Sequence, residues 1–358
     1  MKVLLTTDWY APAVNGVVTS VKNLRRELER RGHEVRILTL SQTTRSREQD
    51  GVTALGSVAA GLIYPGARLR TALAGGYVRE LVEWGPDVVH SQCEFSTFFL
   101  ARRIAEELDV PLVHTYHTVY EDYTHYVSPS VRFGRKAVAL FSRWIASQTD
   151  CLVAPTGKVR FLLESYGVSR PVFVVPSGID LRRFRREPDP WRMAVLKASL
   201  EIPADNLVLV SVGRLAAEKN VEELLRLRAA MGSEAVTLLL VGDGPHRARL
   251  EAVAAELGLH APAVVFTGMV PPEQVGDWYQ LGDLFVSAST SETQGLTYAE
   301  ALAAGVPALC RADPCLSGVI RDGENGWQYQ DEADFLRKLS LFRSQPHRRE
   351  QLSRCARE

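Results

Sequence analysis

The chain lacks the features that mark several large classes of protein. Its 358 residues include no run of eighteen apolar residues, and the apolar run in MKVLLTTDWY is too short for a signal peptide. Five cysteines without a regular spacing indicate reduced thiols in an intracellular protein. Basic and acidic residues balance at 42 each, so bulk nucleic-acid binding is disfavoured. We expect a globular protein long enough for about two domains, with no membrane span and no nucleic-acid partner.

Two kinds of site are also disfavoured. The first strand–helix turn has no GxGxxG motif, which argues against a nicotinamide or flavin dinucleotide. The segment CRADPC offers half of a zinc site, but no second cysteine pair exists. His114 and His117 could bind a metal with Asp122 or His125, but residues three apart on a strand point to opposite faces. We predict no metal site, with His114 packed and His117 facing a cleft where its strand meets the following loop.

Short apolar strands alternate with helices through both halves of the chain. The first half runs from KVLLTT to PVFVVPSGID. The alternation restarts after the charged, proline-rich linker LRRFRREPDP, with NLVLVSVGRL and VTLLLVGDGP. This pattern predicts an α/β protein of two doubly wound, Rossmann-like domains, residues 1–182 and 183–358, which face a central cleft at the carboxyl ends of their strands.

Two acids follow one of these strands, in STSETQGLTYAEALAAGVPAL. Glu292 and Glu300 are eight positions apart, which exceeds the spacing of neighbours on one helix face, so we place Glu292 in a loop and Glu300 in the following helix. Carboxylates accept hydrogen bonds from diols, and the first amides of a helix favour anions. Considered alone, Glu300 would be interpreted as a solvated helix residue and Glu292 as an N-cap or loop acid. The amides concerned are those of Gln294, Gly295, Leu296 and Thr297.

Two cations and a glycine occupy comparable loops. Arg214 and Lys219 follow the strand LVLVSVG, where they would neutralise a diphosphate, although a solvated charged loop is the ordinary alternative. Gly16 allows close approach of the backbone to a ligand, or simply begins a helix. A ligand with phosphates between two polyhydroxyl groups would use all of these residues.

Together these segments resemble glycosyltransferase family 4, retaining sugar-nucleotide-dependent enzymes of the GT-B fold. The resemblance spans nearly the whole chain, through PAVNGV, HTYHT, PSGID, GRLAAEKN, VGDGP and the Glu-x7-Glu signature. It implies that Glu300 holds the ribose diol of the nucleotide and that Glu292, with the 294–297 amides, holds the donor sugar. Arg214 and Lys219 would neutralise the diphosphate, so no divalent ion or other cofactor should be required.

The same resemblance assigns three further positions. It places Gly16 near a phosphate and His117 beside the anomeric carbon, where His117 bonds to the donor sugar and is not a nucleophile. It places TGMV near the base, through Gly268, Met269 and Val270.

Within the family, HSQCEFS, HTYHTVYEDYTHY and TSETQGLTYAEALAAG look most like bacterial diacylglycerol glucosyltransferases. This similarity implies transfer of glucose from UDP-glucose to diacylglycerol. Another donor or acceptor, such as GDP-mannose, a phosphoinositol lipid or a polysaccharide, is an alternative. A sugar-nucleotide epimerase or binding protein would use the same cleft. Family members continue past HRREQLSRCARE into a closing helix, which we expect this chain, ending at Glu358, not to contain.

A predicted helix at 131–146 is suited to an anionic membrane surface. No acid lies between Ser128 and Thr149, and residues 1–180 carry 21 basic and 18 acidic side chains against 21 and 24 in the remainder. We expect peripheral attachment at the inner, cytoplasmic face of the plasma membrane. Alternatively, the apolar face of this helix packs on its own sheet. One sector of the helix holds Arg132, Arg135, Lys136 and Arg143, and the opposite sector holds Phe133, Leu140, Phe141, Trp144 and Ile145.

Overall fold

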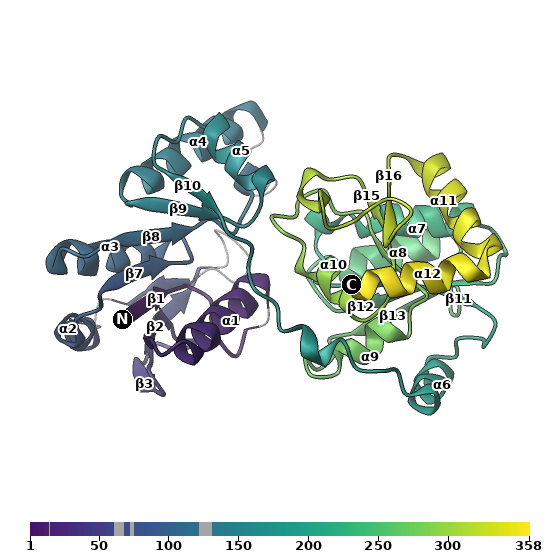
Figure 1. Cartoon of the computed structure of the whole chain (residues 1–358), viewed down its shortest axis with the longest axis horizontal. Helices are drawn as coiled ribbons and strands as arrows, with labels where there is room; N and C mark the ends of the chain where they lie inside the picture. The colour runs from purple at the N-terminus through teal and green to yellow at the C-terminus, as the bar shows by residue number, and fades with distance from the viewer. Residues whose placement is uncertain (14, 61–67, 72–74, 122–130) are drawn as a thin grey trace. The chain divides into compact units, whose positions relative to one another are not determined.

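The computed structural model describes residues 1–13, 15–60, 68–71, 75–121 and 131–358, without the side chains of residues 131 and 132. The chain forms two compact units, Met1–Ile179 and Asp180–Glu358, each with its own mainly or fully parallel sheet (Figure 1). The division lies close to residue 182, where the sequence analysis places it. No helix in the described part of the chain is long and apolar enough to cross a bilayer.

The first unit is built on a sheet with the order β10-β9-β8-β7-β1-β2-β4-β3. All neighbouring strands are parallel except β3 and β4. The order reverses between β1 and β7, so the loops after these strands meet where doubly wound sheets bind ligands. The strands are β1 (Lys2–Thr6), β2 (Glu34–Leu40), β3 (Arg47–Gln49), β4 (Val52–Leu55), β7 (Val88–Ser91), β8 (Leu112–Thr115), β9 (Cys151–Ala154) and β10 (Val172–Val174), with a separate pair β5 (Ser57–Ala59) and β6 (Arg68–Arg70).

Helices flank this sheet (Figure 1), and most of its apolar side chains are buried. Leu4 and Leu5 of β1 are fully buried and contribute to two separate core clusters, as expected for adjacent residues of a strand covered on both faces. Asn15 begins the first helix, since its side-chain oxygen accepts a hydrogen bond from the amide of Val18 at 2.9 Å. The helices are α1 (Gly16–Arg30), α2 (Gly75–Trp84), α3 (Ser96–Leu108), α4 (Val131–Ser147) and α5 (Gly157–Ser165).

The second unit has a fully parallel sheet with the order β13-β12-β11-β14-β15-β16. Its order reverses between β11 and β14, which brings the loops after those strands together. The strands are β11 (Leu207–Val212), β12 (Val236–Val241), β13 (Val264–Gly268), β14 (Leu284–Ser287), β15 (Ala308–Arg311) and β16 (Gly326–Tyr329). The helices are α6 (Pro190–Ser199), α7 (Val221–Ala230), α8 (Arg247–Glu256), α9 (Val275–Gln280), α10 (Leu296–Ala303), α11 (Glu332–Ser344) and α12 (Pro346–Arg357).

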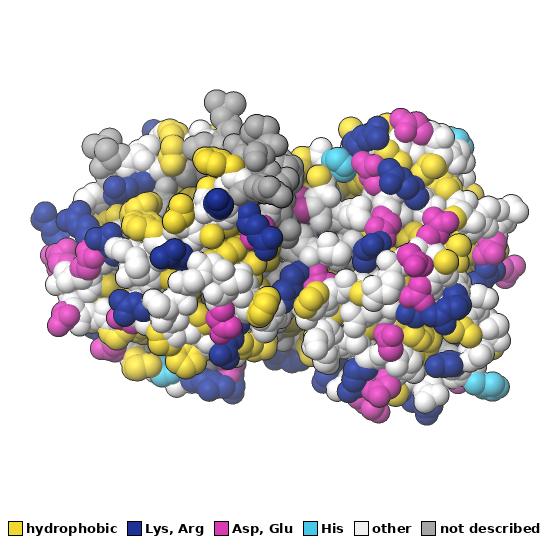
Figure 2. All heavy atoms as spheres, turned by 90° about the horizontal axis from the view of Figure 1, so that it is seen from above, with side chains coloured by type: hydrophobic (Ala, Val, Ile, Leu, Met, Phe, Trp, Pro, Cys, Tyr) yellow, Lys and Arg dark blue, Asp and Glu magenta, His cyan; other side chains and the backbone are white. Residues whose placement is uncertain are grey.

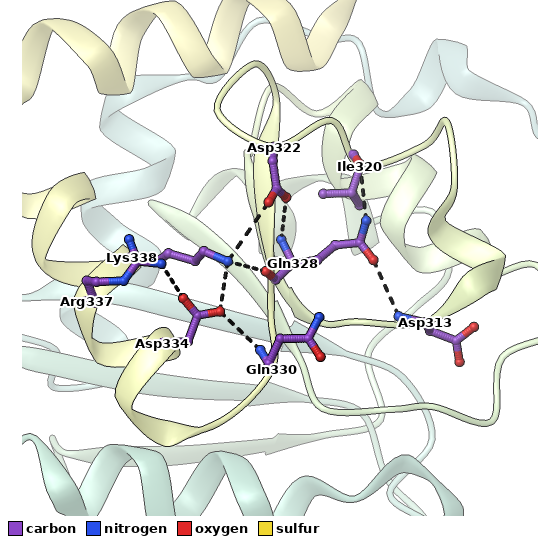
Figure 3. A network of polar contacts seen from close by, with 8 residues as sticks. All are labelled: Asp313, Ile320, Asp322, Gln328, Gln330, Asp334, Arg337 and Lys338. Carbon is purple, nitrogen blue, oxygen red and sulfur yellow. Dashed lines mark hydrogen bonds and ion pairs between the residues drawn. The ribbon is translucent and has the colours of Figure 1, made fainter.

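A polar network holds the edge strand β16 against α11 (Figure 3). Lys338 of α11 donates to the main-chain oxygen of Gln328 and to Asp334 Oδ2, the latter at 2.9 Å. Asp334 also accepts from the amide of Gln330 at 3.2 Å, and Gln328 donates its amide to Asp322 at 2.8 Å. These bonds satisfy a largely buried ammonium group and stabilise the sheet edge.

Candidate active site

In the second unit, the loops after β11 and β14 are joined by side chains. Ser291 Oγ donates to the main-chain oxygen of Glu218 at 3.0 Å. Lys219 Nζ lies 2.6 Å from Glu292 Oε1, and the two side chains are 31 % and 15 % exposed. The sequence assigned these two residues to neighbouring parts of one ligand. The structure brings them into direct contact at the switch point of the sheet.

This ion pair keeps the site charged. Burial acts to lower the pKa of Lys219, but the Glu292 carboxylate outweighs burial and the pKa lies above its ordinary value. The second cation, Arg214, is half-exposed, with Nη1 4.0 Å from Glu218 Oε1. Both cations therefore lie at the carboxyl end of β11, as the sequence predicts. An anionic diphosphate placed here would meet two permanently charged groups.

The second predicted acid, Glu300, has a different environment. It lies on α10, and its Oε2 accepts a hydrogen bond from the hydroxyl of Tyr279 at 2.9 Å. Burial raises the pKa of Glu300, and the Tyr279 bond and the Arg183 charge only partly offset this effect. Sequence reasoning missed Tyr279 and Arg183, because neither is near Glu300 along the chain.

Helix α10 starts at a position that only glycine fits. Gly295 has a φ of +70°, and a Cβ there would lie 2.5 Å from the ring of Tyr298. The Tyr298 hydroxyl in turn bonds to Ser287 Oγ at 2.8 Å, so the ring is fixed from both ends. The amides of Leu296 and Thr297 open this helix and, with those of Gln294 and Gly295, form its anion-favouring end.

Two glycines bring further backbone to this edge of the sheet. A Cβ on Gly242 would lie 2.0 Å from the oxygen of Gly213, and one on Gly244 would lie 2.2 Å from that of Leu215. The loops after β11 and β12 therefore pack backbone against backbone. The TGMV segment follows at the end of β13, where Gly268 adopts a φ of +73°, Met269 is 67 % exposed and Val270 is half-buried.

In the first unit, the loops after β7 and β8 meet through a pair of neutral side chains. His117 Nε2 lies 2.8 Å from Gln92 Oε1. Burial lowers the pKa of His117 to about 3, and His114 and His90 lower it further, so the ring is neutral at physiological pH. His114 is fully buried beside Glu94 at 3.4 Å, whereas His117 is half-buried. The expectation of a packed His114 is confirmed.

The loop after β1 is fastened to α3. Asp8 accepts hydrogen bonds from the amides of Thr97, at 2.8 Å, and Ser96, at 3.1 Å. Burial raises the pKa of this carboxyl to about 6 even though these bonds oppose the shift. Gly16 begins α1, and a Cβ there would meet no atom within 4 Å. The space beside Gly16 allows a ligand to approach the backbone.

No metal site is found among the described residues, which contain no group of three histidine, cysteine or acidic side chains arranged around a common point. Asp122 and His125, the other ligands considered for His114 and His117, lie outside the described residues. In the second unit Cys310 and Cys315 are buried thiols.

Helix α4 divides its apolar residues between the core and the surface. Ile145 is fully buried and Phe141 packs on the core, but Phe133, Leu140 and Trp144 are 69 %, 63 % and 37 % exposed. At 100° per residue, the exposed apolar stripe lies between the buried stripe and the basic one. The alternative, in which the whole apolar face packs on the sheet, therefore holds for only part of that face.

The basic stripe of α4 is solvent-exposed. Arg135, Lys136 and Arg143 are exposed, and Arg135 also bonds to Glu121 at 2.8 Å. The side chain of Arg132 lies outside the described residues. The exposed Phe99 of α3 adds to the apolar stripe, with its ring centroid 5.7 Å from that of Trp144. Figure 2 shows hydrophobic side chains among basic ones on the face of the first unit that carries α4.

Known proteins are similar to this chain in sequence and in fold. The sequence models described as Glycosyltransferase Family 4 and Glycosyl transferases group 1 match residues 14–183 and 193–358. An alpha-monoglucosyldiacylglycerol synthase of Streptococcus pneumoniae is 36 % identical over 93 % of this chain and 76 % of its own length. The enzyme of the same name from Acholeplasma laidlawii is 32 % identical over 97 % and 89 %. The structure of Anabaena HepE in complex with UDP-glucose matches with a TM-score of 0.77 at 16 % identity, over 100 % of this chain and 93 % of that one, a likeness of fold alone.

Proposed function

Because this chain belongs to glycosyltransferase family 4 and has the two Rossmann-like domains of the GT-B fold, we propose that it transfers glucose from UDP-glucose to diacylglycerol. The relatives named alpha-monoglucosyldiacylglycerol synthase support this sugar and this acceptor. An α-linked product from an α-linked donor means retention of configuration at the anomeric carbon.

The observation that carries the proposal is the contact between Lys219 and Glu292 beside the start of α10. A sugar diphosphate needs cations for its phosphates and acceptors for its hydroxyl groups at adjacent points, and this pair provides both. In this scheme Lys219 and Arg214 neutralise the diphosphate, Glu292 and the 294–297 amides bind the glucose, and Glu300 binds the ribose diol. The segment 268–270 lies against the base, with Gly16 near a phosphate.

The first unit supplies His117 and the contact with lipid. His117 hydrogen-bonds the donor sugar, and the leaving phosphate takes the acceptor's proton, so no covalent glycosyl-enzyme forms. The exposed apolar stripe of α4 sits at the membrane surface and its basic stripe contacts anionic headgroups. The enzyme thus acts peripherally, at the cytoplasmic face of the plasma membrane.

An incubation with several labelled sugar nucleotides, with and without diacylglycerol in anionic vesicles, tests the proposal. We expect a glucolipid from UDP-glucose only when diacylglycerol is present, at the same rate with a chelator of divalent ions. Labelled lipid from GDP-mannose, transfer to a phosphoinositol lipid or a polysaccharide, or interconversion of the donor without an acceptor would overturn it. Loss of activity with the chelator, reversed by manganese or magnesium, would refute the metal-free mechanism.

A further inference from the structure

The bond between Gln92 and His117 links two loops that are separate in sequence and adjacent in the sheet. Gln92 follows β7 and His117 follows β8, and these strands pair in parallel with Ser91 opposite His114. Gln92 is 1 % exposed, and its only bond to a described side chain joins its Oε1 to His117 Nε2 at 2.8 Å. The amide of Gln92 is itself fixed, since it donates to the oxygen of Thr6 at 2.8 Å.

The two nitrogens of the His117 ring therefore differ. A neutral imidazole carries one proton, and an amide oxygen can only accept. With Oε1 of Gln92 against it, Nε2 carries the proton and Nδ1 has a lone pair. Nδ1 forms no hydrogen bond with another described residue, and the His117 side chain is only half-buried, so this lone pair is available to a ligand.

Gln92 retains this bond at a cost. Its side-chain nitrogen is buried without a partner among the described residues, which is unfavourable because that nitrogen has lost its hydrogen bonds to water. A side chain needed only to fill space would be apolar here and would avoid that penalty. The amide of Gln92 is therefore better explained by its effect on the tautomer of His117 than by packing.

We propose that Gln92 is a positioning residue for His117, which it holds as the Nε2–H tautomer with the unprotonated Nδ1 turned to accept a hydrogen bond from a substrate hydroxyl. This inference rests on the proposed function for the identity of the substrate. The tautomer of the His117 ring does not depend on the proposed function, because Gln92 sets it in the absence of any ligand. The inference also defines His117 as a hydrogen-bond acceptor, where the sequence indicated only a contact with the sugar.

The ring state can be measured directly. In the full chain labelled with ¹⁵N at histidine, two-bond ¹⁵N–¹H correlation spectra distinguish Nε2–H from Nδ1–H, and His117→Gln identifies the signal. We expect the Nε2–H form in the absence of substrate. The Nδ1–H form would overturn the proposal, because it would mean that the Gln92 amide is rotated and donates to the ring. This result does not depend on which sugar nucleotide the enzyme uses.

Two variants of equal length then separate positioning from packing. Gln92→Met removes the acceptor and should lower kcat about ten-fold to a hundred-fold at every pH, with little change in the donor KM. Gln92→Glu keeps the acceptor but adds a negative charge, which should raise the His117 pKa by about 1 to 3 pH units from its value near 3. The Glu variant should therefore approach wild-type kcat at high pH and lose it on acidification, as the protonated ring loses its acceptor.

Thr115→Val is the matched control. It removes a second bond to a histidine in the same sheet, between His90 Nε2 and Thr115 Oγ1, also 2.8 Å long. We expect it to lower the melting temperature while leaving kcat and the pH profile unchanged. If Gln92→Glu shows the wild-type pH profile and the wild-type His117 pKa, Gln92 is only a packed residue and the proposal fails, whether or not Gln92→Met folds.

Discussion

The two units hold the polar groups at their switch points by different means. In the second unit, the loops after β11 and β14 are joined by a full ion pair, Lys219 with Glu292. In the first unit, the loops after β7 and β8 are joined by two neutral groups, Gln92 and His117. One unit presents permanent charge and the other presents a ring whose proton has a fixed place.

This difference suits the two halves of a group transfer. A diphosphate binds to charge, and its contacts should weaken with salt. A sugar hydroxyl is neutral and is recognised by the direction of a lone pair, which a neutral ring supplies without attracting ions. Changes to the charged unit should therefore act mainly on donor binding, and changes in the neutral loops mainly on turnover.

The largest expected effect concerns the basic stripe of α4. Changing Arg132, Arg135, Lys136 and Arg143 to Gln should reduce partitioning to anionic vesicles by roughly a thousand-fold at low salt, at about 1 kcal/mol for each basic residue. High salt should weaken binding of the parent chain, and neutral vesicles should bind it poorly. Sedimentation with vesicles measures each effect.

A variant with the same charge change in the second unit is the control. Four exposed arginines there each form an ion pair on the surface, and changing all of them to Gln should leave sedimentation as it is. The four are Arg226, Arg249, Arg321 and Arg337. If both variants pellet with anionic vesicles to the same extent as the parent chain, α4 only packs against the first unit and does not contact the membrane.

The next effect concerns His117. His117→Ala should lower turnover about a hundred-fold, because the substrate loses an oriented partner, while UDP affinity and melting temperature change little. Steady-state kinetics, UDP titration and a thermal melt together measure this. Turnover near that of the wild type, or a sugar covalently trapped on any side chain, would contradict the role given to His117.

The two acids of the second unit should behave differently. Glu300→Ala should weaken UDP binding about ten-fold or more, since a ribose diol loses a charged acceptor, whereas Glu292→Ala should spare UDP and lower turnover. Tyr279→Phe is the matched control, because it removes the hydroxyl bound to Glu300 but keeps the carboxylate. Calorimetric titration with UDP measures all three. Equal losses for both acids would show that their roles are assigned wrongly.

The smallest effect is on the pH dependence of stability. The folded chain binds the Asp8 proton more tightly than the unfolded chain, so Asp8 makes stability fall as pH rises from about 4 to 6. His90, whose pKa burial lowers from 6.5 to about 4, does the opposite, because between these two pH values mainly the unfolded chain takes up its proton. Asp8→Asn should therefore show a steeper rise of melting temperature from pH 4 to 6 than the parent chain. Parallel curves would mean that Asp8 is not protonated in this window.

The fold was predictable because it depends on periodicity. Strands alternating with helices and the loops at their carboxyl ends indicated two doubly wound sheets, and the helix expected at 131–146 is α4, Val131–Ser147. The strands β3, β4, β5, β6 and β16 were missed, since their three or four residues contain no continuous run of apolar side chains. The charged, proline-rich linker predicted at 181–190 contains one short helical turn, Leu181–Arg183, and ends where Asp189 caps α6.

The candidate site was only partly predictable, for a related reason. Charges such as Lys219 and Glu292 stand out in a sequence, and each lies in a segment that resembles the family, GRLAAEKN and the Glu-x7-Glu signature. The bond from Gln92 to His117 depends on strand neighbours 25 residues apart, and a glutamine after a strand carries no signal of its own. The adjacency of consecutive parallel strands was a usable clue, since both loops leave the same edge of the sheet.

The backbone contact between the loops after β11 and β12 limits how this enzyme could be redesigned. Gly242 and Gly244 lie against the oxygens of Gly213 and Leu215, with no side-chain layer between the two loops that could be exchanged for another. In a library that varies either glycine, most side chains would clash with the backbone of the neighbouring loop, and the two loops could not pack together. Diversity aimed at a new nucleotide is better placed at Met269, whose side chain is exposed and bears no such constraint.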